Sequence, residues 1–140
     1  MATPLRDDLM VQQQISGAWQ HMVGVIMLNQ TGRKQVKTVL PEFLERWPTP
    51  EKLLHAALEE IQEILKPLGM WRRRADTMVR MSMDYMTWDG EDARKLHGIG
   101  QYGDESYRIF FKGERFEPQD KELRRYLGYD PLPRKKKVKT

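Results

Sequence analysis

The sequence contains no cysteine and no long run of apolar residues. Without cysteine, the chain cannot form disulfides, thiolate zinc sites or an iron–sulfur cluster held by four cysteines. No apolar run approaches the roughly 20 residues that a membrane helix needs, and the N-terminal residues, MATPLRDDLM, lack the basic-then-apolar order of a signal peptide. The histidines His21, His55 and His97 are scattered without metal-site spacing. We therefore expect an intracellular protein with no membrane segment, no metal and no cofactor.

The sequence also lacks the alternation of apolar and polar residues that marks a half-buried strand. Its apolar residues instead recur at spacings of three and four, as in Trp19, Met22, Val23, Ile26 and Met27. This spacing places them on one face of a buried helix. We expect an all-α fold.

The length of 140 residues fits one domain, because a chain of this size can bury roughly 68% of its unfolded surface. We place this single domain at residues 1–132. Residues 133–140 read PRKKKVKT, a run of like charges that cannot be buried. We expect them to form a disordered basic tail.

Several local signals predict where helices begin. Asp7 and Asp8 lie near the start of a segment, 5–15, that we read as a first helix, since its positive end favours acidic residues. Thr49 followed by Pro50 is typical of an N-cap and first helical position. Further helical segments are expected over residues 34–47, 54–65, 91–95 and 101–111.

The positive charge of the chain suits a polyanionic partner. The net charge is +4 and the pI is near 9.4, values that also occur in proteins that never bind nucleic acid. After the break at residues 67–69, Met70 precedes Arg72, Arg73 and Arg74. An exposed apolar residue beside arginines is what a loop needs to wedge between bases while it contacts phosphates. The alternative is that Met70 and Trp71 form a hydrophobic staple for the next helix.

The most informative stretch runs from residue 96 to 120, LHGIGQYGDESYRIFFKGERFEPQD. Glycines 98 and 100 flank Ile99, and we expect both to allow positive φ and a close approach to the backbone amides. A helix follows at once, so its positive end and the free amides face the same point, which suits an anion. We therefore assign phosphate binding to His97, Gly98, Ile99, Gly100 and Gln101, together with Arg72 and Arg73. Asp120 is expected to cap the next helix.

These features resemble the helix-hairpin-helix (HhH-GPD) DNA glycosylase superfamily, with the hairpin motif at about residues 91–111. The most similar members are the thymine glycosylases that act on G:T mismatches and carry a methyl-CpG-binding domain. The resemblance runs from Trp19 to Leu127, and the methyl-CpG-binding domain is not expected in this chain. The matching runs are MLNQT at 27–31, LKPLGMW at 65–71, LHGIGQYG at 96–103, SYRIF at 106–110 and PQDKELRRY at 118–126. The resemblance implies two packed helical lobes with a DNA-binding cleft between them.

The resemblance also implies roles for individual residues. Gln12 and Tyr102 would contact the flipped base, and Gln30 and Met70 would fill the hole that this base leaves in the duplex. Without the resemblance, Gln30 is a polar residue at a helix end, and His97 is read as structural within the hairpin. The family allows a monovalent cation at the hairpin, and we expect a monomer bound to double-stranded DNA with a mispaired or damaged base.

The reaction implied by the family needs a negative charge near the sugar. Cleavage of an N-glycosidic bond builds positive charge on the sugar, and a fixed carboxylate stabilises that transition state. Asp120 is the candidate, although an aspartate before a helix is usually only an N-cap. Bifunctional relatives have a lysine at the second residue after the hairpin, and this chain has Tyr102, which cannot form a Schiff base. Glu122 replaces a lysine of the similar enzymes.

We therefore expect a monofunctional DNA glycosylase of base excision repair, with Asp120 and Tyr102 at the catalytic site. It would remove thymine or uracil opposite guanine, leave an abasic site, and act with the DNA in a nucleoid or nucleus. Two alternatives stay open. One is a non-enzymatic helix-hairpin-helix module that binds DNA, and the other is a glycosylase for another damaged or hypermodified pyrimidine.

Overall fold

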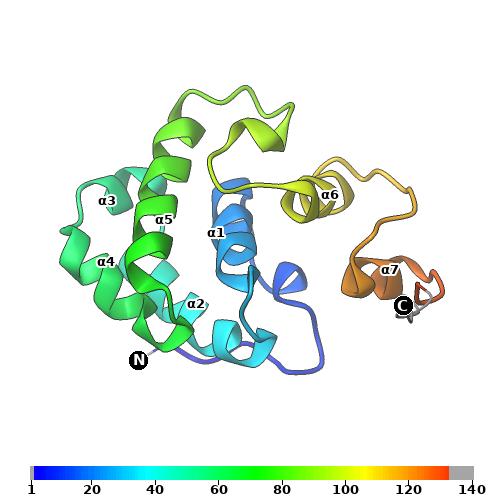
Figure 1. Cartoon of the computed structure of the whole chain (residues 1–140), viewed down its shortest axis with the longest axis horizontal. Coiled ribbons are helices and arrows are strands. Elements are labelled where there is room, and N and C mark those ends of the chain that lie inside the picture. The colour runs from blue at the N-terminus through cyan, green and yellow to red at the C-terminus, as the bar shows by residue number, and fades with distance from the viewer. Residues whose placement is uncertain (1, 133–140) are drawn as a thin grey trace, which may run out of the picture.

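The computed structural model describes residues 2–132, and over this range it consists of helices and loops (Figure 1), which confirms the predicted all-α fold. The basic tail at 133–140 lies outside the described residues, so its disorder stays a prediction. The 3-10 turns are η1 (Val11–Gln13), η2 (Lys66–Leu68) and η3 (Ala93–Lys95). The α-helices are α1 (Ala18–Leu28), α2 (Arg33–Arg46), α3 (Pro50–Leu54), α4 (Leu58–Leu65), α5 (Trp71–Met86), α6 (Gln101–Phe110) and α7 (Lys121–Leu127).

Helix α1 lies at the centre of the larger hydrophobic core. It contacts α2, α5 and α6, and in Figure 1 it stands between the group α2–α5 on one side and α6 and α7 on the other. The apolar residues that the sequence places on one face of this helix are no more than 4% exposed: Trp19, Met22, Val23, Ile26 and Met27. Full burial of one large apolar side chain contributes roughly 1.5–3 kcal/mol to the free energy of unfolding.

A second, smaller core joins α6 and α7 to the N-terminal segment. Met10, Ile109 and Leu123 are its buried residues. Partly buried side chains pack around them: Tyr102, Phe110, Phe116 and Leu127. The two cores correspond to the two packed lobes that the sequence predicts, and the lobes are unequal in size. None of the helices among residues 2–132 has the length and apolar character needed to cross a membrane.

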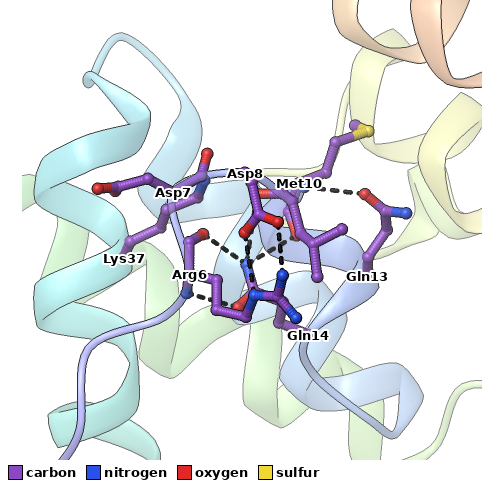
Figure 2. A network of polar contacts seen from close by, with 8 residues as sticks. Arg6, Asp7, Asp8, Met10, Gln13, Gln14 and Lys37 are labelled. Atoms are coloured by element: carbon purple, nitrogen blue, oxygen red, sulfur yellow. Dashed lines mark hydrogen bonds and ion pairs between the residues drawn. The ribbon is translucent and has the colours of Figure 1, made fainter.

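The predicted first helix over residues 5–15 is wrong, because this segment is a loop that contains only the turn η1. The Gln14 side chain replaces the hydrogen bonds of a helix. Its Oε1 accepts the amide of Arg6 at 2.6 Å, and its Nε2 donates to the carbonyl of Arg6 at 2.9 Å. Figure 2 shows this network.

The loop is also attached to α2. The amide of Leu5 donates to the Lys37 carbonyl at 2.9 Å, and Lys37 Nζ donates to the Asp7 carbonyl at 3.0 Å. Lys37 is only 4% exposed, and Figure 2 shows it beside Asp7. The loop thus satisfies its backbone through contacts that a helix of this sequence would not make.

Two further helix boundaries differ from expectation. The segment 54–65 is not continuous, since α3 ends at Leu54 and α4 begins at Leu58 after a turn. The segment 91–95 forms only η3, in which the Asp92 carboxylate caps the amide of Arg94 at 3.0 Å. The predicted cap of α3 is confirmed, because Thr49 Oγ1 accepts the amide of Lys52 at 3.3 Å.

Candidate active site and DNA-binding surface

Asp120 is the N-cap of α7, as the sequence predicts. Its Oδ2 accepts the amides of Glu122 and Leu123, both at 3.0 Å. These two bonds fix the carboxylate against the positive end of the helix. Among the described residues, no hydrogen bond reaches the other oxygen, Oδ1, which stays available to a ligand. The cap therefore holds a half-buried carboxylate with one free oxygen.

Tyr102 is the second residue of α6, and its hydroxyl meets Gln12 from the opposite end of the sequence. Gln12 lies in η1, is 5% exposed, and donates from Nε2 to the Tyr102 hydroxyl oxygen at 2.5 Å. Burial, and next the charge of Asp120, raise the pKa of Tyr102 above its usual value. The phenol is therefore neutral, and its proton can be donated to a ligand.

These three side chains line one hollow of about 440 Å³. Residues 28–33, which connect α1 to α2, form another wall, and Lys121 and Glu122 complete it on the α7 side. The structure thus brings together predicted residues from four separate segments: Gln12, Gln30, Tyr102 and Asp120. A volume of this size is within the range of small-molecule pockets.

An ion pair that the sequence does not reveal closes one side of this hollow. Arg33 at the start of α2 contacts Glu122 of α7 at 3.0 Å, although the two residues are 89 positions apart. The Glu122 side chain is 17% exposed and that of Arg33 is 47% exposed. Glu122, noted above as a departure from similar enzymes, therefore links the two lobes at the rim.

Gln30 and Met70, the two predicted wedge residues, line a second hollow of about 370 Å³. Both adopt the left-handed conformation, with φ of 60° and 48°. This conformation costs energy for a residue other than glycine and is concentrated at functional sites. Met70 is 43% exposed, while Trp71 packs against the larger core. Their insertion into DNA stays a prediction.

The three arginines after Met70 do not share one role. Arg72 and Arg73 are exposed, and Arg73 lines the same hollow as Met70. Arg74 is 4% exposed and donates to the carbonyls of Asn29 at 2.6 Å and Leu68 at 3.3 Å. The interpretation of the three-arginine run as phosphate contacts is therefore wrong for Arg74, because its guanidinium joins the two wedge loops.

The hairpin has one glycine with positive φ where the sequence predicts two. Gly98 has φ +84°, and a Cβ there would lie 2.4 Å from Thr77 Cγ2. Gly100 has φ −104°, so it needs no special conformation, and no atom lies within 4 Å of a Cβ built on it. Gly98 is therefore required by packing, whereas Gly100 leaves open space above the backbone.

The hairpin amides are not all free. The amide of Ile99 donates to the Leu96 carbonyl at 3.1 Å, and its side chain is 5% exposed. The amide of His97 donates to Asp84 Oδ2 at 2.9 Å. Among the described residues, no acceptor is found for the amides of Gly98, Gly100 and Gln101, and α6 has no side-chain cap. These amides are the ones that an anion could use, and they line a hollow of about 750 Å³.

Two buried polar residues that the sequence reading does not single out lie behind the candidate active site. Ser106 of α6 is 0% exposed and its Oγ is 2.7 Å from His21 Nε2 of α1. Burial lowers the pKa of His21 to about 4, so its ring is neutral. The only signal in the sequence is a histidine that follows Gln20 in a helix whose other residues are apolar.

The chain is similar over most of its length to DNA repair proteins of one family. Residues 23–138 match the family described as "HhH-GPD superfamily base excision DNA repair protein". Over 113 residues the chain is 29% identical to a methyl-CpG-binding domain protein 4-like protein of Arabidopsis thaliana, covering 79% of this chain and 25% of that protein. Over 91 residues it is 34% identical to a thymine/uracil-DNA glycosylase of Pyrobaculum aerophilum, covering 60% of this chain and 40% of that protein.

Solved structures share the fold. A thermostable thymine-DNA glycosylase matches with a TM-score of 0.73 at 19% identity, over 87% of this chain and 58% of that one. An endonuclease III in a non-covalent complex with DNA matches with a TM-score of 0.70 at 17% identity, over 85% and 59%. The chain thus spans less than two thirds of the length of each of these relatives. Because the family match covers most of the chain, the chain belongs to the HhH-GPD superfamily of base excision DNA repair proteins.

Proposed function

We propose that this chain is a monofunctional DNA glycosylase that extrudes a thymine or uracil opposite guanine and hydrolyses its N-glycosidic bond. The observation that carries the proposal is the hollow in which Gln12, Tyr102 and Asp120 meet. It combines neutral polar groups suited to a pyrimidine with one fixed carboxylate. The similarity to a thymine/uracil-DNA glycosylase of Pyrobaculum aerophilum and a thymine-DNA glycosylase of Aeropyrum pernix supports this choice of base.

The carboxylate supplies the main electrostatic contribution. As the bond to the base breaks, positive charge develops at C1′ of the sugar, and Asp120 stabilises that charge more than it stabilises the ground state. The α7 amides hold Oδ2, so the carboxylate needs no reorganisation during the reaction. The free Oδ1 can orient or deprotonate the attacking water.

The surroundings of the hollow support binding to duplex DNA. The second hollow, with Gln30 and Met70, lies next to the first, because Asn29 and Gln30 line both. The Gln30 and Met70 side chains can fill the gap in the base stack while the extruded base enters the first hollow. The free hairpin amides at the start of α6 suit a phosphate of the same strand, since backbone amides at a helix start bind anions.

Residue 102 supports the proposed absence of lyase activity. Tyr102 stands where bifunctional relatives have a lysine, and a phenol forms no imine with the sugar. Lys121 also lines the hollow and is exposed. Its amine is therefore the alternative nucleophile that an experiment has to examine.

The test is single-turnover incubation with duplexes that contain G:T, G:U or damaged pyrimidines, followed by hot alkali to break abasic sites. The wild-type protein should give strand breaks only after alkali. Asp120→Asn keeps an acceptor for the two cap amides and removes the charge, so it should lose on the order of 100-fold or more in rate while it still binds DNA.

The matched control is Asp120→Ala, which also removes the cap and should lower the free energy of unfolding by about 1 kcal/mol. Full activity of Asp120→Asn would contradict the catalytic role and favour a DNA-binding module without activity. Excision of a damaged pyrimidine in preference to thymine and uracil would favour the other alternative.

A further inference from the structure

A buried chain of hydrogen bonds leads from the candidate active site into the protein. Gln12 Nε2 donates to the Tyr102 hydroxyl at 2.5 Å and to Ser106 Oγ at 3.3 Å, and Ser106 Oγ is 2.7 Å from His21 Nε2. The inner members are closed to solvent, at 5% exposure for Gln12, 0% for Ser106 and 1% for His21. They come from η1, α6 and α1.

The donor and acceptor of each hydrogen bond in this network follow from which atoms carry hydrogen. An amide nitrogen of glutamine only donates, so Ser106 Oγ accepts from Gln12 and must give its own proton elsewhere. The neutral His21 ring can accept it at Nε2, which requires the ring proton to lie on Nδ1. With the Gln12 amide in this orientation, a proton on His21 Nε2 would leave the Ser106 hydroxyl hydrogen without a partner, and a buried unpaired donor costs about 1–3 kcal/mol.

The same hydrogen bonds fix which end of the Gln12 amide faces a ligand. Because Nε2 is occupied by Tyr102 and Ser106, the carbonyl oxygen Oε1 is left, and among the described residues it has no hydrogen-bond partner. Gln12 lines the hollow with Asp120. The hollow therefore presents a hydrogen-bond acceptor from Gln12 and a donor from the Tyr102 hydroxyl.

We propose that His21 and Ser106 are positioning residues that lock the Gln12 amide with its oxygen toward the substrate, so that the site selects a base with an N–H donor on the facing edge. Thymine and uracil carry such a donor at N3, whereas 5-methylcytosine has an acceptor there. The inference rests on the proposed function and specifies how the site recognises its substrate. A freely rotating amide would accept either kind of edge.

The first arm of the experiment is independent of activity. Long-range proton–nitrogen NMR of the full chain should find His21 Nε2 without a proton and Nδ1 with one, and the Gln12 side-chain amide protons protected from exchange. In Ser106→Ala, that protection should be lost. A proton on His21 Nε2 would overturn the proposal. Each hydrogen bond from His21 through Ser106 to Gln12 would then have the opposite direction, and Gln12 would present its amide donors to the substrate.

The second arm measures selectivity. The ratio of single-turnover excision rates for thymine and 5-methylcytosine, each opposite guanine, is compared between proteins, so pairing and leaving-group differences cancel. Ser106→Ala and His21→Leu should each lower this ratio about tenfold, because the loss of one hydrogen bond of about 1.4 kcal/mol corresponds to a tenfold change in rate. His21→Gln restores an acceptor for Ser106 and should recover most of the ratio.

Circular dichroism melting confirms that each variant is folded. If both rates fall equally and the ratio stays constant, His21 and Ser106 only support the fold, and the proposal is wrong. If the wild-type protein excises neither base, the proposed function fails, and the NMR arm alone decides whether His21 and Ser106 position Gln12.

Discussion

At the scale of single residues, position 102 decides which products the proposed reaction can give. Tyr102 and Asp120 line the same hollow, so a residue at 102 lies within reach of a sugar placed beside the carboxylate. The neutral phenol can donate a hydrogen bond to a base and cannot attack carbon. An amine in its place would form a Schiff base.

We expect Tyr102→Lys to cleave DNA strands without alkali and to form an adduct that borohydride traps. Tyr102→Phe is the matched control, because it keeps the ring and supplies neither hydroxyl nor amine, and it should form no adduct. The measurement is a denaturing gel of labelled duplex. An adduct with the wild-type protein that disappears in Lys121→Ala would show that Lys121 already acts as a lyase nucleophile.

At the scale of elements, the hairpin and the wedge loops depend on packing beneath them. The backbone at Gly98 runs against Thr77 of α5, whereas that at Gly100 faces open space. Arg74 of α5 joins the carbonyls of the two wedge loops. Helix α5 therefore supports both parts of the candidate DNA-binding surface from one side.

The two hairpin glycines should respond differently to alanine. Gly98→Ala forces a side chain into a left-handed conformation and against Thr77, so the free energy of unfolding should fall by about 1–3 kcal/mol. Gly100→Ala should change stability by less than about 0.5 kcal/mol and weaken DNA binding, because its methyl group occupies the approach to the amides. Urea unfolding and fluorescence anisotropy measure the two effects, and equal losses of stability would contradict this division.

Arg73 and Arg74 form a second contrasting pair. Arg73→Ala should lower the slope of log affinity against log salt by about 0.9, the value for one phosphate contact, with little change in stability. Arg74→Met leaves buried carbonyls unpaired and should cost about 1–3 kcal/mol of stability. Anisotropy titrations over a range of salt separate the two, and an unchanged slope for Arg73→Ala would remove it from the phosphate contacts.

At the scale of the whole molecule, burial of His21 between the lobes makes stability depend on pH. Its pKa is about 4 in the folded protein and 6.5 when exposed, so the unfolded state binds the proton more readily. The contribution of neutral His21 to the free energy of unfolding is complete above pH 6.5 and is lost as pH falls toward 4. The pKa shift corresponds to about 3 kcal/mol.

The check is urea unfolding of the wild type and His21→Gln between pH 7 and pH 4. The difference in unfolding free energy between the two proteins should shift by about 3 kcal/mol in favour of the variant as pH falls. Carboxylates titrate equally in both proteins and cancel. Parallel curves would show that His21 does not titrate on unfolding.

Signals contained within one or two turns of the chain were enough to predict much of this protein. The stripe from Trp19 to Met27 predicts the central helix, and the caps at Thr49 and Asp120 are observed. The residues 96–103 predict a hairpin before a helix. Such features are readable because hydrophobic spacing, capping and turn conformation depend on neighbours in sequence.

Only the tertiary structure decided the rest. The loop at residues 5–15 is held by Gln14 and by Lys37 of a different element. Burial turns Arg74 into a link between loops, and Ser106 meets His21 across 85 positions. The sequence by itself determined the central helix, the caps at Thr49 and Asp120 and the family, since these follow from local spacing and motifs. The partners of the buried polar groups were decided by packing, because each must find its hydrogen bond wherever the folded chain brings a donor or acceptor.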